Sequence, residues 1–242
     1  MTKRNTILHL VSAVALVLLP TSCILDTKYE ALPFDGKVLP RITGYSGESH
    51  DTNDWMYFNL REDKIYNLDF SGQDIKEGEQ NTNMDWDLAV CGYHFRTNSG
   101  YSGDGKGAAA DLGYGNYDNL TSVSQIPSDA EWVTDDSTVF VTMSLRDWQR
   151  YLNKRGESLD ENPWFDPNSG PQRTRTSGNP LLDRAIVISG PPMTYTPSYH
   201  TYVIRSADGE RYFKLQVISW FDENVKIGGD GGLMSYYCDE LL

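Results

Sequence analysis

A hairpin pattern near the C-terminus limits the possible folds more than any other feature of the chain. Two runs rich in β-branched and aromatic residues, Tyr199 to Arg205 and Tyr212 to Phe221, flank the tetrapeptide Ala-Asp-Gly-Glu at residues 207–210. Asp-Gly between two such runs is the strongest short-range signal for an antiparallel hairpin. The C-terminal part of the chain is therefore predicted to be antiparallel β-structure.

Further strands are predicted along most of the chain. Trp55 to Leu60 and Ile65 to Phe70 flank a polar tetrapeptide, and the strict apolar and polar alternation of the second run predicts a hairpin with one buried face. Trp86 to Phe95 and Ser137 to Met143 are two more strand regions. Sandwiches and barrels of about 200 to 250 residues commonly form one domain. We therefore expect a single all-β domain at 55–242, mainly an antiparallel sandwich.

Two stretches depart from the strand pattern. Ser144 is a suitable N-cap, and apolar residues at helical spacing follow it through Glu157. A short amphipathic helix is therefore predicted there. Asn162 to Pro180 is dense in Pro, Asn, Ser and Gly, a composition typical of a long surface loop.

The N-terminus has the organisation of an export signal. Two basic residues precede the apolar run Ile7 to Leu19, which is too short for a comfortable membrane span of roughly 20 residues. Small residues then lead to Cys23, the arrangement of a lipoprotein signal, although Pro20 stands where such signals usually have Leu. We expect a signal peptide at 1–22 and a lipidated linker at 23–54, with plain secretion as the alternative.

The acidic charge of the chain excludes several kinds of partner. The net charge of −13 becomes −15 once the signal peptide and its two basic residues are removed. Such a balance argues against nucleic acid and against an electrostatic membrane patch. Membrane attachment would therefore depend on the lipid at Cys23.

Two cysteines, Cys91 and Cys238, remain after Cys23. In an oxidising compartment they could form one disulfide. The alternative is that Cys91, in the apolar run that begins at Leu88, is a small buried residue. We favour the buried cysteine, because the sequence gives no distance between the two sulfurs.

Sequence signals for catalysis are missing. The glycine-rich stretch Gly100 to Gly107 lacks the Ser or Thr that follows Lys in a phosphate loop, so it predicts a solvated β-loop. The histidines left after export, His50, His94 and His200, match no zinc spacing. No nucleophile elbow or calcium loop is present either. We expect a binding protein and no enzyme.

Three blocks carry a family resemblance. The first is WMYFNL at 55–60, and the second runs from Trp86 through Arg96, Asn98 and the glycines that end at Gly107. The third combines SGPPMTY at 189–195 with the C-terminal hairpin. Together these blocks resemble the HmuY family of haem-binding outer-membrane lipoproteins. The resemblance covers about residues 54–224, and the second block is its most specific part.

The resemblance implies both a fold and a function. It implies an all-β domain that holds one haem b, iron protoporphyrin IX, with two side chains on the iron. It also implies capture of haem from host or bacterial haemoproteins and transfer to a TonB-dependent outer-membrane haem receptor. The expected location is the outer membrane, surface-exposed on a lipid anchor, or a released soluble form.

The iron ligands must be argued residue by residue, because founding members of the family use two histidines and other members use methionine. Met193 is the first candidate, since the prolines before it fix the backbone at the family's second ligand loop. Met143, at the end of a predicted strand, is the candidate partner. Core packing is the alternative role for both methionines. His200 is the alternative ligand, because imidazole is a common axial ligand of haem, whereas His94 is interpreted as structural.

Haem also needs apolar walls and partners for its propionates. Trp148, Tyr195 and Tyr199 are predicted to supply ring surface beside the ligands, as large cofactor pockets require. Arg173 and Arg175 are candidates for the propionates, with loop solubility as their alternative role. A second function from another class stays open: an exported β-sandwich rich in Tyr and Trp could be a glycan-binding or adhesin-like lipoprotein.

Overall fold

A computed structural model of the chain describes residues 34–40, 55–68, 74–76, 78–143, 172–192, 194–223 and 231–242. Asp35 to Leu242 form one compact unit. Cys23, the signal peptide, the helix predicted at 144–157 with Trp148, and Met193 lie outside the described residues. Their roles therefore stay predictions.

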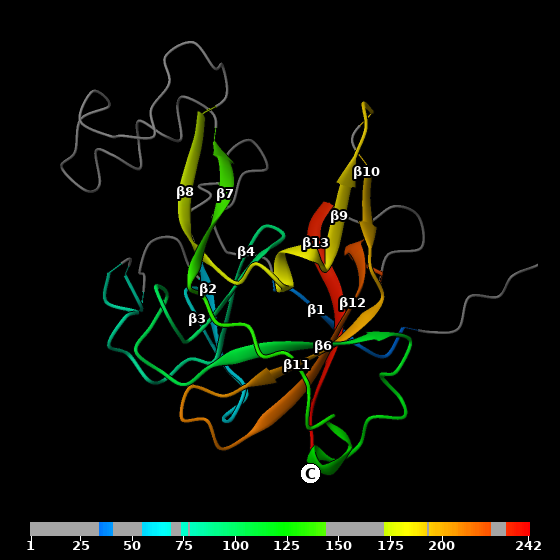
Figure 1. The fold of residues 1–242 in the computed structure, drawn as a ribbon. Coiled ribbons are helices and arrows are strands. Elements are labelled where there is room, and N and C mark those ends of the chain that lie inside the picture. Colours follow the sequence, from blue (N-terminus) through cyan, green and yellow to red (C-terminus); the bar gives the residue numbers. More distant parts are fainter. Residues whose placement is uncertain are drawn as a thin grey trace, which may run out of the picture. The chain divides into compact units, whose positions relative to one another are not determined.

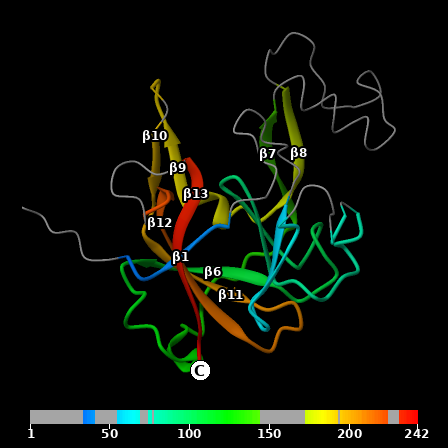
Figure 2. The same cartoon turned by 180° about the vertical axis from the view of Figure 1, so that it is seen from behind.

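Two antiparallel sheets make up most of the compact unit (Figures 1 and 2). The five-stranded sheet has the order β1 (Lys37–Val38), β13 (Gly231–Glu240), β12 (Tyr212–Phe221), β11 (His200–Arg205) and β6 (Ala108–Tyr114). The four-stranded sheet has the order β3 (Lys64–Tyr66), β2 (Met56–Asn59), β4 (Leu88–Cys91) and β5 (His94–Thr97). β1 falls inside the segment 23–54 that we expected to be linker.

Two further hairpins extend from the same end of these sheets (Figures 1 and 2). One pairs β7 (Ser137–Met143) with β8 (Gln172–Gly178), and the other pairs β9 (Ile186–Ser189) with β10 (Thr194–Pro197). Helical structure in the described residues amounts to two 3₁₀ turns, Val123–Gln125 and Leu182–Arg184. None of the described helical segments is long and apolar enough to cross a membrane.

The main core lies between the two sheets. Phe58, Leu88 and Val90 of the four-stranded sheet belong to the same buried cluster as Leu215 and Val217 of the five-stranded sheet. Each sheet also has a second apolar cluster, which includes Trp55, Trp86 and Cys91 in one sheet and Val203 with Leu241 in the other. This explains why β2, β4 and β5 are buried at every position. The predicted all-β antiparallel sandwich is confirmed.

Several strand predictions agree closely with the structure. β7 and β12 have the predicted bounds, and β2 pairs with β3 as the predicted hairpin. The prediction of one strand region from Trp86 to Phe95 was wrong, because this region contributes to two strands, β4 and β5. Gly92 stands between them with a φ of +60°, a left-handed conformation that glycine adopts without steric cost.

The predicted loop at 162–180 was wrong in its last part, because residues 172–178 form β8. The Gly, Pro and Ser content of this stretch favours a loop, but β7 supplies a seven-residue partner that pairs with it from Gly178 back to Gln172. Thr174 and Thr176 are β-branched and suit a strand. Tertiary pairing outweighed local composition here.

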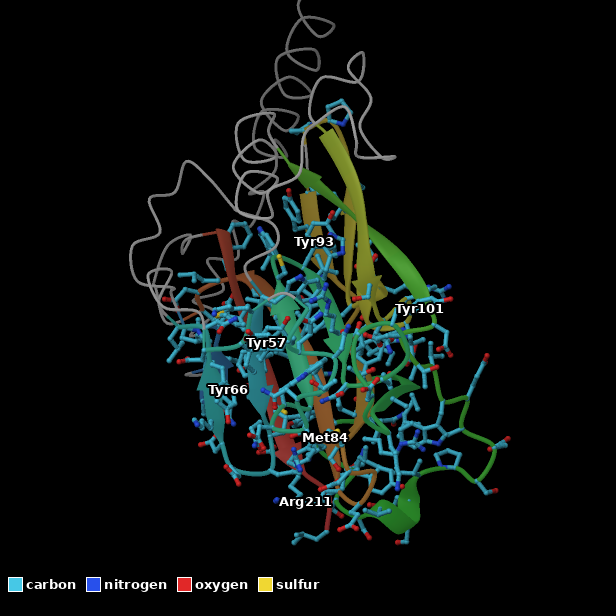
Figure 3. All side chains as sticks on the ribbon, turned by 90° about the vertical axis from the view of Figure 1, so that its left-hand side faces the viewer. Tyr57, Tyr66, Met84, Tyr93, Tyr101 and Arg211 are labelled. Atoms are coloured by element: carbon cyan, nitrogen blue, oxygen red, sulfur yellow. The ribbon has the colours of Figure 1, made fainter. Side chains whose placement is uncertain are left out.

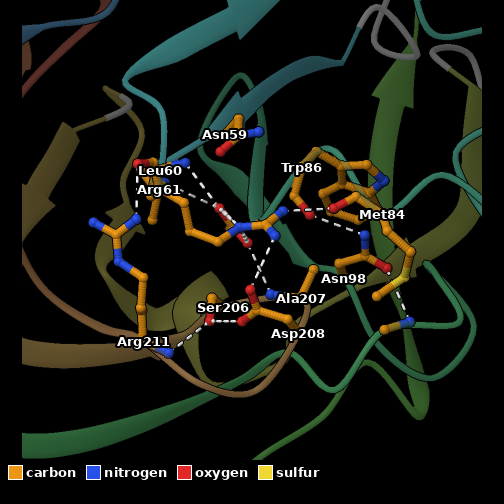
Figure 4. Close-up of polar contacts among 12 residues, drawn as sticks. Asn59, Leu60, Arg61, Met84, Trp86, Asn98, Ser206, Ala207, Asp208 and Arg211 are labelled. Carbon is orange, nitrogen blue, oxygen red and sulfur yellow. Dashed lines mark hydrogen bonds and ion pairs between the residues drawn. The ribbon is translucent and has the colours of Figure 1, made fainter.

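Asp87 joins the two sheets through buried hydrogen bonds (Figure 4). Its fully buried carboxylate accepts the Leu60 amide at 2.8 Å and the Ala207 amide at 2.8 Å. Arg61 places Nε 3.0 Å from the same carboxylate and NH1 3.1 Å from Asp208. Leu60 belongs to the β2–β3 connection and Ala207 to the β11–β12 connection, so the Asp87 side chain fixes both turns.

Cys91 and Cys238 are both buried. They belong to different apolar clusters, Cys91 on β4 and Cys238 on β13. The prediction that Cys91 is a small buried residue is confirmed.

Candidate functional site

An aromatic cluster lies where the β9–β10 hairpin meets the five-stranded sheet. Tyr195 on β10 stacks on Trp220 of β12, with ring centroids 4.8 Å apart and planes 11° apart. Tyr93 completes the cluster at 5.9 Å from Trp220 and 6.4 Å from Tyr195. Tyr195 and Tyr93 are half-buried, so part of this ring surface faces out of the core.

The aromatic cluster and the Asp87 network occupy opposite ends of the compact unit. Figure 3 shows Tyr93 toward one end of the view, and Met84 with Arg211 toward the other. Arg211 belongs to the Asp87 end, because its NH1 donates to the Arg61 carbonyl at 2.8 Å. The end that carries Tyr93 is the end from which the two hairpins extend.

Met193 follows Pro192 in the connection between β9 and β10, whose described part is Gly190 to Pro192. The loop expected at the prolines before Met193 is present in these residues, which connect two strands. Thr194, the next residue along the chain, pairs with Ser189 across the hairpin. Tyr195, a member of the aromatic cluster, is therefore only two residues from Met193 in sequence.

His94 connects β5 to the root of the β9–β10 hairpin. The side chain is 5% exposed, and its Nδ1 contacts the carboxylate of Asp183, which lies in the 3₁₀ turn before β9. Its ring also packs against Tyr93 at 4.0 Å. Both contacts fit the structural role expected for His94.

His200 is the first residue of β11 and pairs with Tyr114 of β6, and Tyr199 directly precedes it. His200 places Nδ1 2.8 Å from Asp111, and its side chain is 38% exposed. Tyr199 contacts the exposed Tyr114 edge to face at 6.4 Å, so it joins a different ring pair from Tyr195. A carboxylate on Nδ1 leaves Nε2 as the nitrogen that a metal could take.

Met143 is the last residue of β7, and its backbone pairs with Gln172. The next pair in the register is Thr142 with Arg173, and Arg175 pairs with Phe140. Residues about 30 positions apart in sequence are thus neighbours on one hairpin. The sequence could not show this, because it predicted no strand at 172–178.

Asp135, Thr97 and Asn179 clamp the root of the β7–β8 hairpin. Asp135 lies two residues before β7, and Asn179 directly follows β8. The buried Asp135 carboxylate accepts the Thr97 amide at 3.0 Å, the Thr97 hydroxyl at 2.6 Å and the Asn179 side-chain amide at 3.0 Å. Burial raises the pKa of Asp135 to about 6, while these hydrogen bonds act to lower it. The clamp ties both ends of the hairpin to β5.

The glycine stretch after Asn98 is a packing feature. Asn98 is fully buried, and its side-chain amide donates to the Trp86 carbonyl at 2.9 Å and the Asn83 carbonyl at 2.8 Å (Figure 4). A Cβ added at Gly103 would lie 2.1 Å from the Asn98 side chain, and one at Gly107 would lie 2.7 Å from its carbonyl oxygen. The predicted solvated loop is correct for the exposed Tyr101, Asp104 and Lys106, but not for the buried Gly103 and Gly107, which pack on Asn98.

Gly107→Ala should lower the free energy of unfolding by about 1 to 3 kcal/mol, because the new methyl group meets backbone atoms of Asn98 that cannot move independently. Urea unfolding followed by tryptophan fluorescence measures this. Gly92→Ala is the control, since its Cβ would meet nothing within 4 Å and only the positive φ costs stability, so its loss should be clearly the smaller of the two. Equal losses in the two variants would contradict the packing role.

The described residues define an antiparallel β-sandwich from which two hairpins extend. The HmuY protein family matches residues 51–238, which is most of the chain. This protein belongs to the HmuY family. The part of the chain that the structure describes holds no group of three His, Cys, Asp or Glu residues suited to a metal ion.

Solved structures share this fold. Apo PinO from Porphyromonas gingivitis is 12% identical, with a TM-score of 0.52 over 87% of this chain and 99% of that chain. The apo HmuY analog (TFO) from Tannerella forsythia is 14% identical, with a TM-score of 0.51 over 86% and 95%. A candidate HmuY-like haem-binding protein from Bacteroides vulgatus is 18% identical, with a TM-score of 0.47 over 79% and 92%. No curated protein matches the chain.

Proposed function

We propose that this protein binds haem b as a haemophore-like lipoprotein, takes haem from host or bacterial haemoproteins and passes it to a TonB-dependent outer-membrane receptor. The observation that carries the proposal is the match to the HmuY family over residues 51–238. This is a haem-binding family and not a catalytic one. The placement of the chain on the outer membrane by a lipid at Cys23 is part of the proposal.

Met193 and Met143 are the proposed iron ligands. Met143 ends the strand β7, and Met193 lies in the connection between β9 and β10, so the two residues belong to the two hairpins that extend from the same end. Tyr195 lies two residues after Met193 in sequence, and its ring stacks on Trp220 of β12. These two rings supply apolar surface for the haem. Trp148 is proposed as a further wall. A thioether is a soft ligand that suits ferrous iron.

The polar residues have subordinate roles in this proposal. Arg173 and Arg175 follow Met143 in the register of β7 and β8, which supports them as partners for the propionates. His200 stays the alternative ligand, because Asp111 holds its Nδ1 in the way that carboxylates commonly hold metal-binding histidines. Tyr199 accompanies His200 in that alternative.

Titration of the purified apo-protein with haemin should give a sharpened Soret band that saturates near one haem per chain. With two methionine ligands, binding should tighten when the iron is reduced and should persist as the pH falls from about 7.5 to 5.5, because a thioether takes no proton in this range. An imidazole ligand would protonate near pH 6.5. Release of haem from folded protein across this range, without preference for reduced iron, would identify His200 instead.

Asp135 titrates within the same range and needs a control. Its raised pKa means that the folded protein binds the proton more tightly than the unfolded chain. Its contribution to stability therefore rises as the pH falls through about 6, so acidification in this window does not unfold the protein through Asp135. Circular dichroism recorded at each pH separates haem release from unfolding.

Cys23→Ala should abolish lipid-dependent partition into the membrane fraction and leave a soluble or unprocessed protein. The reason is that two or more acyl chains, unlike one, give lasting attachment to a bilayer. Membrane fractionation with detergent extraction measures this. A Cys91→Ala variant serves as the control, since that buried thiol is no candidate for lipidation. A Cys23 variant that still fractionates with the outer membrane would argue against the anchor.

Glycan binding is the second candidate function. Tyr114 and Tyr199 are 72% and 40% exposed and form an edge-to-face pair beside His200, a surface on which a sugar ring can stack. A haemin titration that gives the broad spectrum of free haem and no sharpened Soret band would favour this function.

A further inference from the structure

A cavity of about 380 Å³ lies between the two sheets. The described residues that line it lie on or next to β1 to β5, β12 and β13, whereas the proposed haem ligands belong to the β7–β8 and β9–β10 hairpins. Its walls come from the four-stranded sheet on one side and from β12 and β13 on the other, and they include Phe58, Leu88, Val90, Leu215, Val217 and Met234. Cavities of roughly 300 to 1,000 Å³ with such walls are typical of small-molecule sites.

The interior of the cavity suits hydrocarbon, because most of its lining residues are apolar, the polar exceptions being Lys37, Asn59, Asp63 and Lys64. Its walls are mainly aliphatic and aromatic, and burial raises the pKa of the Cys238 thiol at the wall to about 12, so that group stays neutral. A polar ligand placed there would lose its hydrogen bonds to water without replacement. The cavity has the volume of about a dozen water molecules at roughly 30 Å³ each. Its mainly apolar walls offer these waters too few hydrogen-bond partners, so an apolar ligand is favoured.

Haem does not suit this cavity. Among the described residues that line it there is no histidine, and the soft donors, Met234 and Cys238, stand four residues apart on one strand. At about 3.3 Å per residue they are roughly 13 Å apart and on the same wall, so they cannot take opposite faces of one iron.

Two lysines, Lys37 and Lys64, line the cavity, and both are exposed. Lys37 on β1 lies at the edge of the lining with its side chain 50% exposed, and it pairs at 3.4 Å with Asp63, which is 91% exposed. An exposed ion pair of this kind contributes little and is readily exchanged. In a chain of net charge −13, the Lys37 ammonium at an apolar opening favours a ligand whose polar end is an anion.

The strand that carries Lys37 also forms part of the wall. Val38, Leu39 and Pro40 line the cavity, and β1 is held to β13 by two residue pairs and by the Leu39 amide, which donates to the Met234 carbonyl at 2.9 Å. Because β1 is a two-residue strand at the edge of its sheet, it is a natural place of entry.

We propose that this cavity binds the hydrocarbon chain of a fatty acid, with the carboxylate at the rim beside Lys37. Dodecanoic acid is the probe. Native mass spectrometry of the delipidated full chain should show one bound dodecanoate per chain, and dodecanol should bind at least several-fold more weakly. Excess haemin should not displace dodecanoate, because the two ligands occupy separate sites.

Matched variants test the two parts of the site. Val217→Phe places a ring in the empty space and should weaken dodecanoate binding at least tenfold, with haemin titration unchanged. Leu88→Phe repeats this from the opposite sheet. Lys37→Glu should weaken binding several-fold, whereas Lys76→Glu, which changes another exposed lysine paired with a glutamate, should not.

Three results would overturn the proposal. They are no dodecanoate adduct on folded wild-type protein, equal binding by the Lys37 and Lys76 variants, and one-for-one displacement of dodecanoate by haemin. Loss of haemin binding with retained dodecanoate binding would support the cavity and reject only the haem proposal, so the two proposals fail separately.

Discussion

Asp87→Ala should lower the free energy of unfolding by about 3 to 5 kcal/mol, the usual cost of removing one member of a buried, hydrogen-bonded charge pair. The substitution leaves the Leu60 and Ala207 amides without their acceptor and Arg61 without its closest anion. Since Asp87 fixes the β2–β3 and β11–β12 connections together, both sheets should lose stability in one transition. Urea unfolding followed by circular dichroism and by tryptophan fluorescence measures the loss.

Asp85→Ala is the matched control, because Asp85 is the other carboxylate of the same Asp-Trp-Asp sequence and is exposed. Surface substitutions of this kind usually change stability by less than about 0.5 kcal/mol. A loss of the same small size in the Asp87 variant would show that the network in Figure 4 does not hold the sheets together.

Met193→Ala should weaken haem binding by at least the 10- to 100-fold range that follows the loss of residues supporting a metal site. The substitution removes one proposed axial bond, and the β fold should stay intact because Met193 lies between strands. The Soret and visible bands should shift toward a lower-coordinate or solvent-ligated form, and haem should dissociate faster. Absorption spectra and transfer of haem to apomyoglobin measure both effects.

Met84→Ala provides the control for this prediction. Met84 is 41% exposed and lies toward the end of the compact unit away from Tyr93 (Figure 3), so the same substitution there should leave the spectrum and the haem affinity unchanged. Met143→Ala should repeat the effect of Met193→Ala. An unchanged Met193 variant would exclude that ligand, and His200→Ala would then be the decisive variant.

The sequence allowed the fold class to be predicted because its signals are local. The Asp-Gly turn at residues 208–209 and the β-rich runs around it predicted β11 and β12, and the bounds of β7 followed from the same kind of pattern. β8 was missed because its stability depends on its partner β7, and its own composition is that of a loop. β13 was missed for the same kind of reason, since glycines begin the strand and only pairing with β12 completes it.

The site could be predicted only in part. Resemblance suggested the methionines, and Tyr195 was predicted to supply ring surface beside them, but nothing in the sequence indicates that its ring stacks on Trp220, 25 residues later. That the glycines after Asn98 pack on this residue could not be predicted, because spacing cannot show which side chain a missing Cβ makes room for. The clamp of Asp135, Thr97 and Asn179 joins three segments, and each of its residues is an ordinary polar residue when read alone.

That clamp bears on how much change the chain can tolerate. Asp135 and Asn179 bring the two ends of a long excursion, residues 136–178, together at one buried point, so the length and composition of the excursion are decoupled from the register of the sheets. Substitutions within the excursion should therefore leave the strand pairing of the two sheets unchanged. The sandwich is a scaffold whose inserted hairpin can vary independently of it.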